Sequence, residues 1–209
     1  MRIPAPPLLL VTDRHHASGD LPDIAESAFS AGCRWLSLRE KDLPASEQIH
    51  LLREIMRLGE RHAARVTLHG KAELAREAGA HGVHLSGGSD TVEARRLLGD
   101  DALIGLSIHT VDEARTAKAG TTDYVIAGPV YETASKPGYG PTLGTNGLAR
   151  IVQACAVPVV AIGGITPENA RECRAAGAAG IAVMGGVMRA KNPAGSVTQL
   201  IAALQPRPR

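Results

Sequence analysis

The fold is decided by residues 159–186, which read VVAIGGITPENARECRAAGAAGIAVMGG. An apolar run and a glycine pair come first, then a helix-like stretch ending in Ala176-Gly177, then a second apolar run and a second glycine pair. Glycine after the last turn of a helix takes the left-handed conformation without steric cost. Short apolar runs bounded by glycine are typical of strands buried on both faces, as in a parallel sheet. The stretch therefore predicts strand, helix and parallel strand, with Thr166 as the N-cap of a helix that begins at Pro167.

The same punctuation recurs outward along the chain. Further Ala-Gly pairs stand at residues 31–32, 78–79 and 119–120, each between a helix-like stretch and a short apolar run. The expected strands are residues 8–12, 35–38, 66–68, 82–85, 103–107, 124–127, 159–162 and 180–183. The expected helices are residues 21–30, 46–62, 72–78, 91–98, 111–119, 146–155, 167–175 and 196–204.

Eight strands, each followed by a helix, predict a (β/α)8 TIM barrel formed as a single compact domain by residues 1–204. Residues 205–209 form a tail whose composition predicts no packed structure. The alternative is a doubly wound open sheet. That fold would normally carry a glycine-rich dinucleotide motif after its first strand, and residues 12–16, TDRHH, are nothing of that kind.

Composition narrows the class of protein. The 209 residues are 44% hydrophobic and 21% charged, with a formal net charge of +2, which suits an ordinary globular protein and not a nucleic-acid binder. No apolar run reaches the roughly 20 residues of a membrane helix, and no signal peptide is recognisable. We therefore expect a cytoplasmic protein without a membrane segment. Three cysteines without C-x-x-C spacing indicate neither a disulfide framework nor a thiolate metal site.

The loops after the seventh and eighth strands predict a phosphate site. A (β/α)8 barrel builds its active site from loops at the carboxyl ends of its strands, and these two loops commonly bind phosphate. Gly163 and Gly164 follow one strand, and Gly185 and Gly186 follow the other. Glycine pairs let the backbone approach an anion closely, and helix N-termini offer unpaired N–H groups. Tight turns alone would also explain the glycines, but two pairs at the two expected loops favour phosphate binding.

Two other strand ends carry cations. Arg39 and Lys41 follow the second strand, and alternation places them on the same side, where they can hold a carboxylate or a phosphate. An exposed charged loop is the other interpretation of these two residues. The loop 128–138 after the sixth strand is long, rich in glycine and hydroxyls, and holds Lys136, as expected of a loop that closes over an anion. The simpler interpretation is a mobile surface loop.

One histidine stands where a general acid or base belongs. His109 follows the fifth strand, and imidazole titrates near neutral pH. His69 and His84 lie at or near the ends of the third and fourth strands, but no accompanying pattern predicts a zinc site. His84, between two apolar neighbours, is expected to be a hydrogen-bonded interior residue.

Taken together, these segments resemble the thiamine phosphate synthase / TenI superfamily. The resemblance extends in order from about Leu8 to Val187 and rests on VTDR at 11–14, LREKD at 38–42, GVHL at 82–85, GLSIHT at 105–110, DYVIAGPV at 123–130, Glu132-Thr133 with Lys136, AIGGITP at 161–167 and GIAVM at 180–184. It implies a (β/α)8 barrel that acts on a thiazole phosphate in thiamine biosynthesis.

Two departures within this pattern favour one branch of the superfamily. Synthases carry Asn-Asp-Arg after the third strand and Gly-Gln-(Asp/Glu)-Asp after the fourth, and the Asp of each helps to hold magnesium on a pyrophosphate. Here Gly70 stands at the position of the first Asp, and Asp90 lies one place late. Magnesium prefers carboxylate oxygens, so both departures count against the synthase reaction. The TenI-type thiazole tautomerases resemble this sequence at both points.

The resemblance therefore implies an isomerase that aromatises a carboxylated dihydrothiazole ethyl phosphate by general acid–base proton transfer, with no metal and no cofactor. In this hypothesis His109 moves the proton, and Arg39 and Lys41 neutralise the carboxylate and the charge that develops on the ring. The four glycines of the two pairs bind the phosphate, while Thr133 and Lys136 close the sixth loop over it.

Two other functions remain open from the sequence. One is a thiamine phosphate synthase, which joins a pyrimidine pyrophosphate to the thiazole phosphate and in which Asp90 shifts to reach magnesium. The other is a non-catalytic barrel that binds a thiamine-related phosphate. In each case the partner is a small phosphorylated molecule, neither nucleic acid nor membrane, and a homo-oligomer remains open.

Overall fold

The computed structural model describes residues 3–133 and 140–205 of the chain. In the described residues, parallel strands close into a barrel in chain order, and the last strand pairs with the first through Leu8 and Ile181. The strands are β1 (Leu8–Val11), β2 (Trp35–Leu38), β3 (Arg65–His69), β4 (Gly82–Leu85), β5 (Leu103–Ile108), β6 (Tyr124–Ala127), β7 (Val159–Ile162) and β8 (Gly180–Val183). Pairing of the first and last strands confirms the (β/α)8 TIM barrel and excludes the open sheet.

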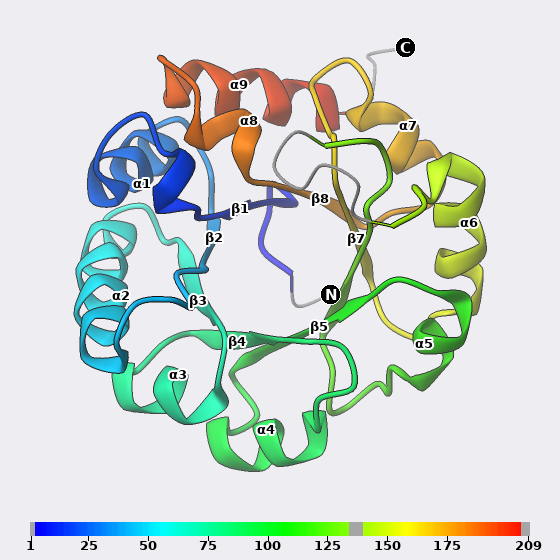
Figure 1. The fold of residues 1–209 in the computed structure, drawn as a ribbon, viewed down its shortest axis with the longest axis horizontal. Coiled ribbons are helices and arrows are strands. Elements are labelled where there is room, and N and C mark those ends of the chain that lie inside the picture. Colours follow the sequence, from blue (N-terminus) through cyan, green and yellow to red (C-terminus); the bar gives the residue numbers. More distant parts are fainter. Residues whose placement is uncertain (1–2, 134–139, 206–209) are drawn as a thin grey trace.

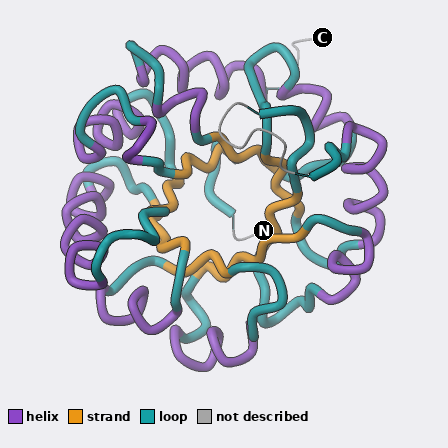
Figure 2. The backbone as a smooth tube through the Cα atoms, in the orientation of Figure 1, coloured by secondary structure: helices purple, strands orange, loops and turns teal. Residues whose placement is uncertain are grey.

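The helices form an outer ring around the strands (Figures 1 and 2). They are α1 (Leu21–Ser30), α2 (Ala45–Glu60), α3 (Ala72–Ala78), α4 (Thr91–Leu98), α5 (Val111–Thr116), α6 (Gly144–Ala154), α7 (Ala170–Ala175), α8 (Gly185–Met188) and α9 (Pro193–Leu204), with a 3-10 turn η1 (Arg14–His16). The division into a domain of residues 1–204 and a tail stays a prediction, and residues 206–209 lie outside the described part.

The Ala-Gly pairs do what their sequence context predicts. Gly32, Gly79, Gly120 and Gly177 have φ values of +100°, +74°, +93° and +94°. This left-handed backbone reverses the chain after a helix and directs it into the next strand.

Several helix boundaries differ from prediction. The expected helix 111–119 stops at Thr116, and the one expected from Pro167 begins at Ala170. Thr166 is not an N-cap, because the Asn169 side chain accepts from the Thr166 N–H at 2.8 Å and donates to the Gly164 carbonyl at 2.9 Å. These two bonds fold residues 164–169 into a turn ahead of the helix.

The barrel interior is divided into a polar half and an apolar half. Inward positions alternate along each strand, and most of them belong to a cluster that includes Leu9, Trp35, Tyr124, Val160 and Ala182. The inward residues nearest the carboxyl ends are polar on β2 to β5 and apolar on β6 to β8 and β1. These are Ser37, His69, His84 and Ser107 on the polar side, and Ile126, Ile162, Met184 and Val11 on the apolar side.

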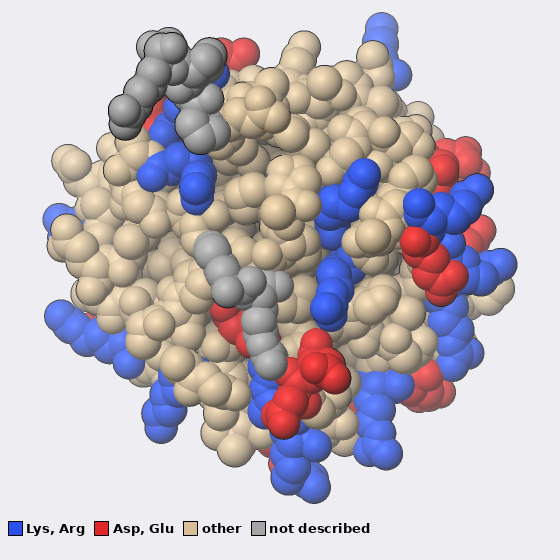
Figure 3. All heavy atoms as spheres, turned by 180° about the vertical axis from the view of Figure 1, so that it is seen from behind, with Lys and Arg blue, Asp and Glu red and all other residues tan. Residues whose placement is uncertain are grey.

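The main core lies between the barrel and the helices, and it contains Cys33 and Cys173, both fully buried. Burial raises the pKa of the Cys33 thiol to about 11, so this residue behaves as an apolar core side chain. None of the helices in residues 3–133 and 140–205 is long and apolar enough to cross a bilayer. On the face opposite that of Figure 1, acidic and basic side chains lie beside one another along the rim (Figure 3).

Candidate active site

The carboxyl ends of the strands open into a cavity of about 710 Å3, and the end of every strand contributes to its lining. This is the end of the barrel at which the architecture places active sites. The predicted site residues that line the cavity are Arg39, Lys41, His109, Thr133, Gly163, Gly164, Gly185 and Gly186. Lys136 lies outside the described residues.

The cavity wall is divided into a polar and an apolar side, as the barrel interior is. One wall is cationic and polar, and the other is apolar. The polar wall carries Arg39, Lys41, His69, Ser86, Ser107 and His109, and the apolar wall carries Val11, Ile126, Ile162, Ala182 and Met184. Such a cavity suits a heterocycle that packs its face on one wall and directs anionic or hydrogen-bonding groups to the other.

A buried carboxylate fixes the loop that carries Arg39 and Lys41. Glu40 is only 2% exposed, and its carboxylate accepts a 2.7 Å hydrogen bond from the Thr12 hydroxyl. The Arg14 backbone N–H donates to the same carboxylate at 3.2 and 3.3 Å, and the Arg39 backbone N–H donates to Thr12 Oγ1 at 2.8 Å. Burial raises the pKa of Glu40, although the hydrogen bond from Thr12 opposes this shift. The network joins the loops after β1 and β2 and fixes the backbone from which both cations project.

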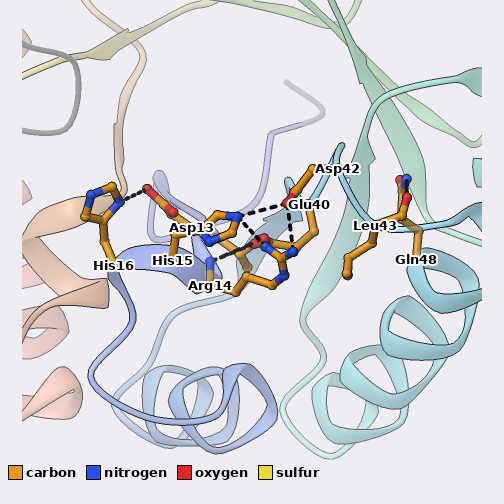
Figure 4. A network of polar contacts seen from close by, with 9 residues as sticks. Asp13, Arg14, His15, His16, Glu40, Asp42, Leu43 and Gln48 are labelled. Atoms are coloured by element: carbon orange, nitrogen blue, oxygen red, sulfur yellow. Dashed lines mark hydrogen bonds and ion pairs between the residues drawn. The ribbon is translucent and has the colours of Figure 1, made fainter.

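The same network extends to the rim of the barrel (Figure 4). The Arg14 guanidinium donates to Asp42 at 2.7 Å, and His15 Nε2 lies 2.9 Å from the same carboxylate oxygen. The Asp42 side chain is 53% exposed, and ion pairs of such exposure contribute little stability. Their role here is to hold the loops in register. At the exposed mouth of the cavity, Lys41 Nζ donates to Ser86 Oγ at 3.3 Å.

His109 is held in a defined orientation at the end of β5. Its Nδ1 lies 2.7 Å from the Gly128 carbonyl oxygen. A carbonyl oxygen only accepts, so Nδ1 carries a proton, and in the neutral ring Nε2 is the atom that accepts. The imidazole can therefore present Nε2 as an acceptor to a bound molecule.

The turn beneath His109 is fixed by a capping box that the sequence analysis missed. Glu113 accepts from the backbone N–H groups of His109 and Thr110 at 2.6 and 2.9 Å, and Thr110 Oγ1 accepts from the Glu113 N–H at 3.1 Å. Partial burial raises the pKa of Glu113, but the two backbone hydrogen bonds outweigh this effect and the net pKa is lowered. The Thr-x-x-Glu spacing of Thr110 and Glu113 is the signal that predicts such a box.

The two glycine pairs contain glycine for different structural reasons. Gly163 and Gly164 have φ values of +102° and +63°, and a Cβ on Gly164 would lie 2.3 Å from the Glu132 carbonyl oxygen. This first pair is thus needed for close packing of the loop after β7 against the loop after β6. A Cβ on Gly186, in contrast, would meet nothing within 4 Å, so the backbone there borders open cavity.

A further cation was missed near the second glycine pair. Arg189 lines the cavity and lies at the C-cap of the four-residue helix α8, one helical turn after Gly185. The sequence alone does not identify Arg189 as a site residue, because its spacing of one turn from Gly185 has a meaning only when the short helix α8 is known. The cavity therefore has cationic side chains beside both the β2 loop and the β8 loop.

The carboxylates of this end of the barrel do not fit a magnesium site. Asp90, the acidic residue after β4, is the N-cap of α4, where its Oδ1 accepts from the N–H groups of Val92 and Glu93 at 2.9 and 3.1 Å. It does not line the cavity, and Gly70 offers no ligand. Across residues 3–133 and 140–205, no group of three or more His, Cys, Asp or Glu side chains could hold a metal ion. Magnesium in phosphate-binding sites is usually held by one or two carboxylates together with the substrate phosphates, and neither residue 70 nor Asp90 supplies a carboxylate to this cavity.

Comparison with known proteins gives consistent matches over nearly the whole chain. The family model described as thiamine monophosphate synthase matches residues 8–187. A Geobacter sulfurreducens protein, provisionally named thiamine-phosphate synthase, is 42% identical over 204 residues, covering 97% of this chain and 96% of its own. The thiamine-phosphate synthase of Chlorobium phaeobacteroides is 35% identical over 204 residues, covering 95% and 98%. The solved thiamine phosphate pyrophosphorylase of Pyrococcus furiosus superposes with a TM-score of 0.83 at 28% identity, covering 94% of each chain.

These relatives contradict the prediction of a thiazole tautomerase. The relatives at 35–42% identity are named for the synthase, so the isomerase reading of the departures at Gly70 and Asp90 was wrong. The physical reason lies in the charge of the cavity. Two absent magnesium ligands change how a pyrophosphate is neutralised, but Arg39 and Lys41 line the same cavity and supply positive charge themselves.

Proposed function

The chain belongs to the thiamine monophosphate synthase family, and from this premise we propose that it is a transferase that joins a thiazole phosphate to a pyrimidine carried as its pyrophosphate ester. In this reaction the thiazole nitrogen forms a bond to the methylene carbon of the pyrimidine. The bond from that carbon to the pyrophosphate oxygen breaks with its electron pair. Thiamine phosphate and pyrophosphate are the products.

The observation that carries this proposal is the distribution of anion-binding groups in one cavity. Arg39 and Lys41 lie at the β2 side, while Arg189 and the backbone of Gly185 and Gly186 lie at the β8 side. The reaction needs two phosphorylated substrates in one cavity with their heterocycles adjacent. Separate anion-binding groups beside an apolar wall suit that requirement.

On the β7 and β8 side, we assign the thiazole phosphate to the main-chain N–H groups of the two glycine loops. Gly186 leaves the backbone accessible, and Arg189 adds a fixed charge. Thr133, from the loop after β6, lines the same cavity and supplies a hydroxyl. Lys136 would follow it in that loop but lies outside the described residues.

On the β2 side, we assign the pyrophosphate to Arg39 and Lys41. Negative charge grows on the leaving group as the carbon–oxygen bond breaks, and cations fixed beforehand stabilise it without reorganisation. The Glu40 network provides that fixation through the Arg39 backbone.

His109 has a different role in this reaction than in the isomerisation. The bond exchange consumes no proton and releases none, because the thiazole nitrogen attacks with a lone pair. The oriented imidazole therefore serves to hold a substrate by hydrogen bonding to Nε2.

The test is incubation of purified protein with both substrates, with product and pyrophosphate measured separately. We expect thiamine phosphate and pyrophosphate in equal amounts, and neither when one substrate is omitted. Lys41→Met should reduce the rate, whereas Arg76→Met, on an exposed part of α3, should not. No product with both substrates, with or without added magnesium, would refute the proposal.

A further inference from the structure

A fully buried histidine connects the closed barrel interior to the cavity. His84 lies in β4 at 0% exposure, and its ring packs 4.6 Å from the ring of His69 and 5.6 Å from the ring of Tyr124, measured between centroids. Its Nε2 lies 2.8 Å from Oγ of Ser107, which lines the cavity. The buried imidazole thus ends on a hydroxyl that a bound substrate can contact.

The neighbouring strand is built to let the imidazole take this position. Gly105 lies directly beside His84 in the sheet and two residues before Ser107. A Cβ on Gly105 would lie 2.5 Å from His84 Nδ1 and 2.2 Å from Tyr124 Cζ. Only glycine leaves room for both rings, so the strand that carries Ser107 also makes space for its partner.

The proton on His84 can be placed by elimination. Burial, together with the nearby charge of Lys41, lowers the pKa of His84 to about 3, so the ring is neutral and carries one N–H. No hydrogen-bond partner of Nδ1 exists among the described residues. A buried N–H without an acceptor is costly, whereas an N–H on Nε2 meets the Ser107 oxygen. The neutral ring therefore carries its proton on Nε2.

We infer that His84 is a positioning residue that donates from Nε2 to Ser107 Oγ and so turns the Ser107 hydroxyl proton toward the cavity. A serine hydroxyl has one donor and accepts through its oxygen. Once the oxygen accepts from His84, the O–H is directed away from the imidazole. It then donates to an acceptor of the bound substrate, a ring nitrogen or a phosphate oxygen. This inference rests on the proposed function.

The kinetic test compares four variants and a control. His84→Leu fills the buried position with an apolar side chain and removes the donor, and we expect kcat to fall roughly tenfold, the value of one hydrogen bond. His84→Gln, whose amide can donate from a similar position, should recover most of that loss. In a Ser107→Ala background, His84→Leu should cause no additional loss. His81→Gln is the control, because His81 lies outside the cavity and accepts from the Val66 N–H.

A spectroscopic test on the unmodified protein does not depend on activity or on variants that fold. Nitrogen-15 NMR of histidine-labelled protein reports the tautomer of each neutral ring. We expect His84 as the Nε2–H tautomer, unchanged between pH 5 and 8. The Nδ1–H tautomer, or additive losses in the double variant, would overturn the inference. If the NMR result holds but no thiamine phosphate forms, the proposed function fails while the hydrogen bond from His84 stands.

Discussion

Gly105→Ala is the perturbation that most directly tests the packing of the barrel interior. The added methyl group would lie 2.2 Å from Tyr124 Cζ and 2.5 Å from both Tyr124 Cε2 and His84 Nδ1. Ordinary contacts between carbon atoms are about 3.5–4.0 Å, so the tyrosine ring would have to move by more than about 1 Å. Tyr124 is fully buried and packs edge-on against Trp35 at 4.6 Å between centroids, so it cannot move alone.

The expected cost follows from this rigidity. Overpacking of a well-packed core costs about 1–3 kcal/mol, and a clash with two buried rings belongs at the upper end of that range. For a chain of this size, about 3 kcal/mol corresponds to a fall in Tm of roughly 6–12 °C. Displacement of His84 also lengthens its bond to Ser107, so kcat should fall together with Tm.

Thermal unfolding followed by circular dichroism measures the effect, with Gly19→Ala as the matched control. Gly19 is exposed, and a Cβ there meets nothing within 4 Å, so its variant should unfold within about 2 °C of the wild type. If Gly105→Ala unfolds as close to the wild type as the control does, the description of a tightly packed His84–Tyr124 layer is refuted.

Three further predictions concern charge at the mouth of the barrel. Arg39→Met or Lys41→Met should raise KM for the pyrophosphate substrate by roughly 10- to 100-fold in steady-state kinetics, which is the value of a charged hydrogen bond. The control variant Arg76→Met should leave this KM unchanged. Equal effects of all three variants would contradict the assignment. Asp90→Asn keeps the N-cap of α4 and should preserve both Tm and kcat. Asp90→Ala removes the cap and should lower the free energy of unfolding by about 1 kcal/mol while kcat is preserved. A large loss of kcat in both variants would show that this carboxylate serves catalysis. Glu113→Gln keeps the capping geometry but removes a carboxylate, and the pKa of that carboxyl group is lowered in the folded chain. The wild type should therefore be more stable than the variant by about 0.5 kcal/mol at pH 7. This advantage should disappear as the pH falls through the lowered pKa. Thermal melts at pH 7 and pH 3 check the last prediction, which is wrong if the difference in Tm is the same at both.

The strands could be predicted because their signals are local. Apolar runs and Ala-Gly pairs located every strand to within about two residues, since left-handed glycine and buried parallel strands each need only nearby residues. Helix α8 could not be predicted in this way. It holds four residues, two of them glycine, and contacts from distant loops stabilise it, including the Ser18 N–H to the Met188 carbonyl at 2.7 Å.

The site was predictable where one strand's alternation places a residue inward. Arg39 and Lys41 were found on that basis and His109 by its place directly after the fifth strand, and each lines the cavity. Ser107 lies two residues before His109 on the same face but was missed. A serine in a strand does not indicate a functional role unless its hydrogen-bond partner is known. That partner, His84, belongs to the neighbouring strand, and only the register of β4 with β5 brings the two together.

The branch of the family could not be predicted from Gly70 and Asp90. Two substituted positions do not determine whether the charge of a pyrophosphate is neutralised by magnesium or by cationic side chains. A site that binds pyrophosphate through magnesium carries carboxylates, which repel the anion until the metal arrives. A site without those carboxylates has no such repulsion, and at an effective dielectric of about 20 each close like-charge pair removed is a gain on the order of a few kcal/mol. Here Asp90 is engaged by the backbone of α4, Gly70 carries no charge, and Arg39 and Lys41 line the cavity. In the proposed function, loss of the metal ligands and direct binding of pyrophosphate by cations are two parts of one change, so the departures that counted against a synthase are compatible with one.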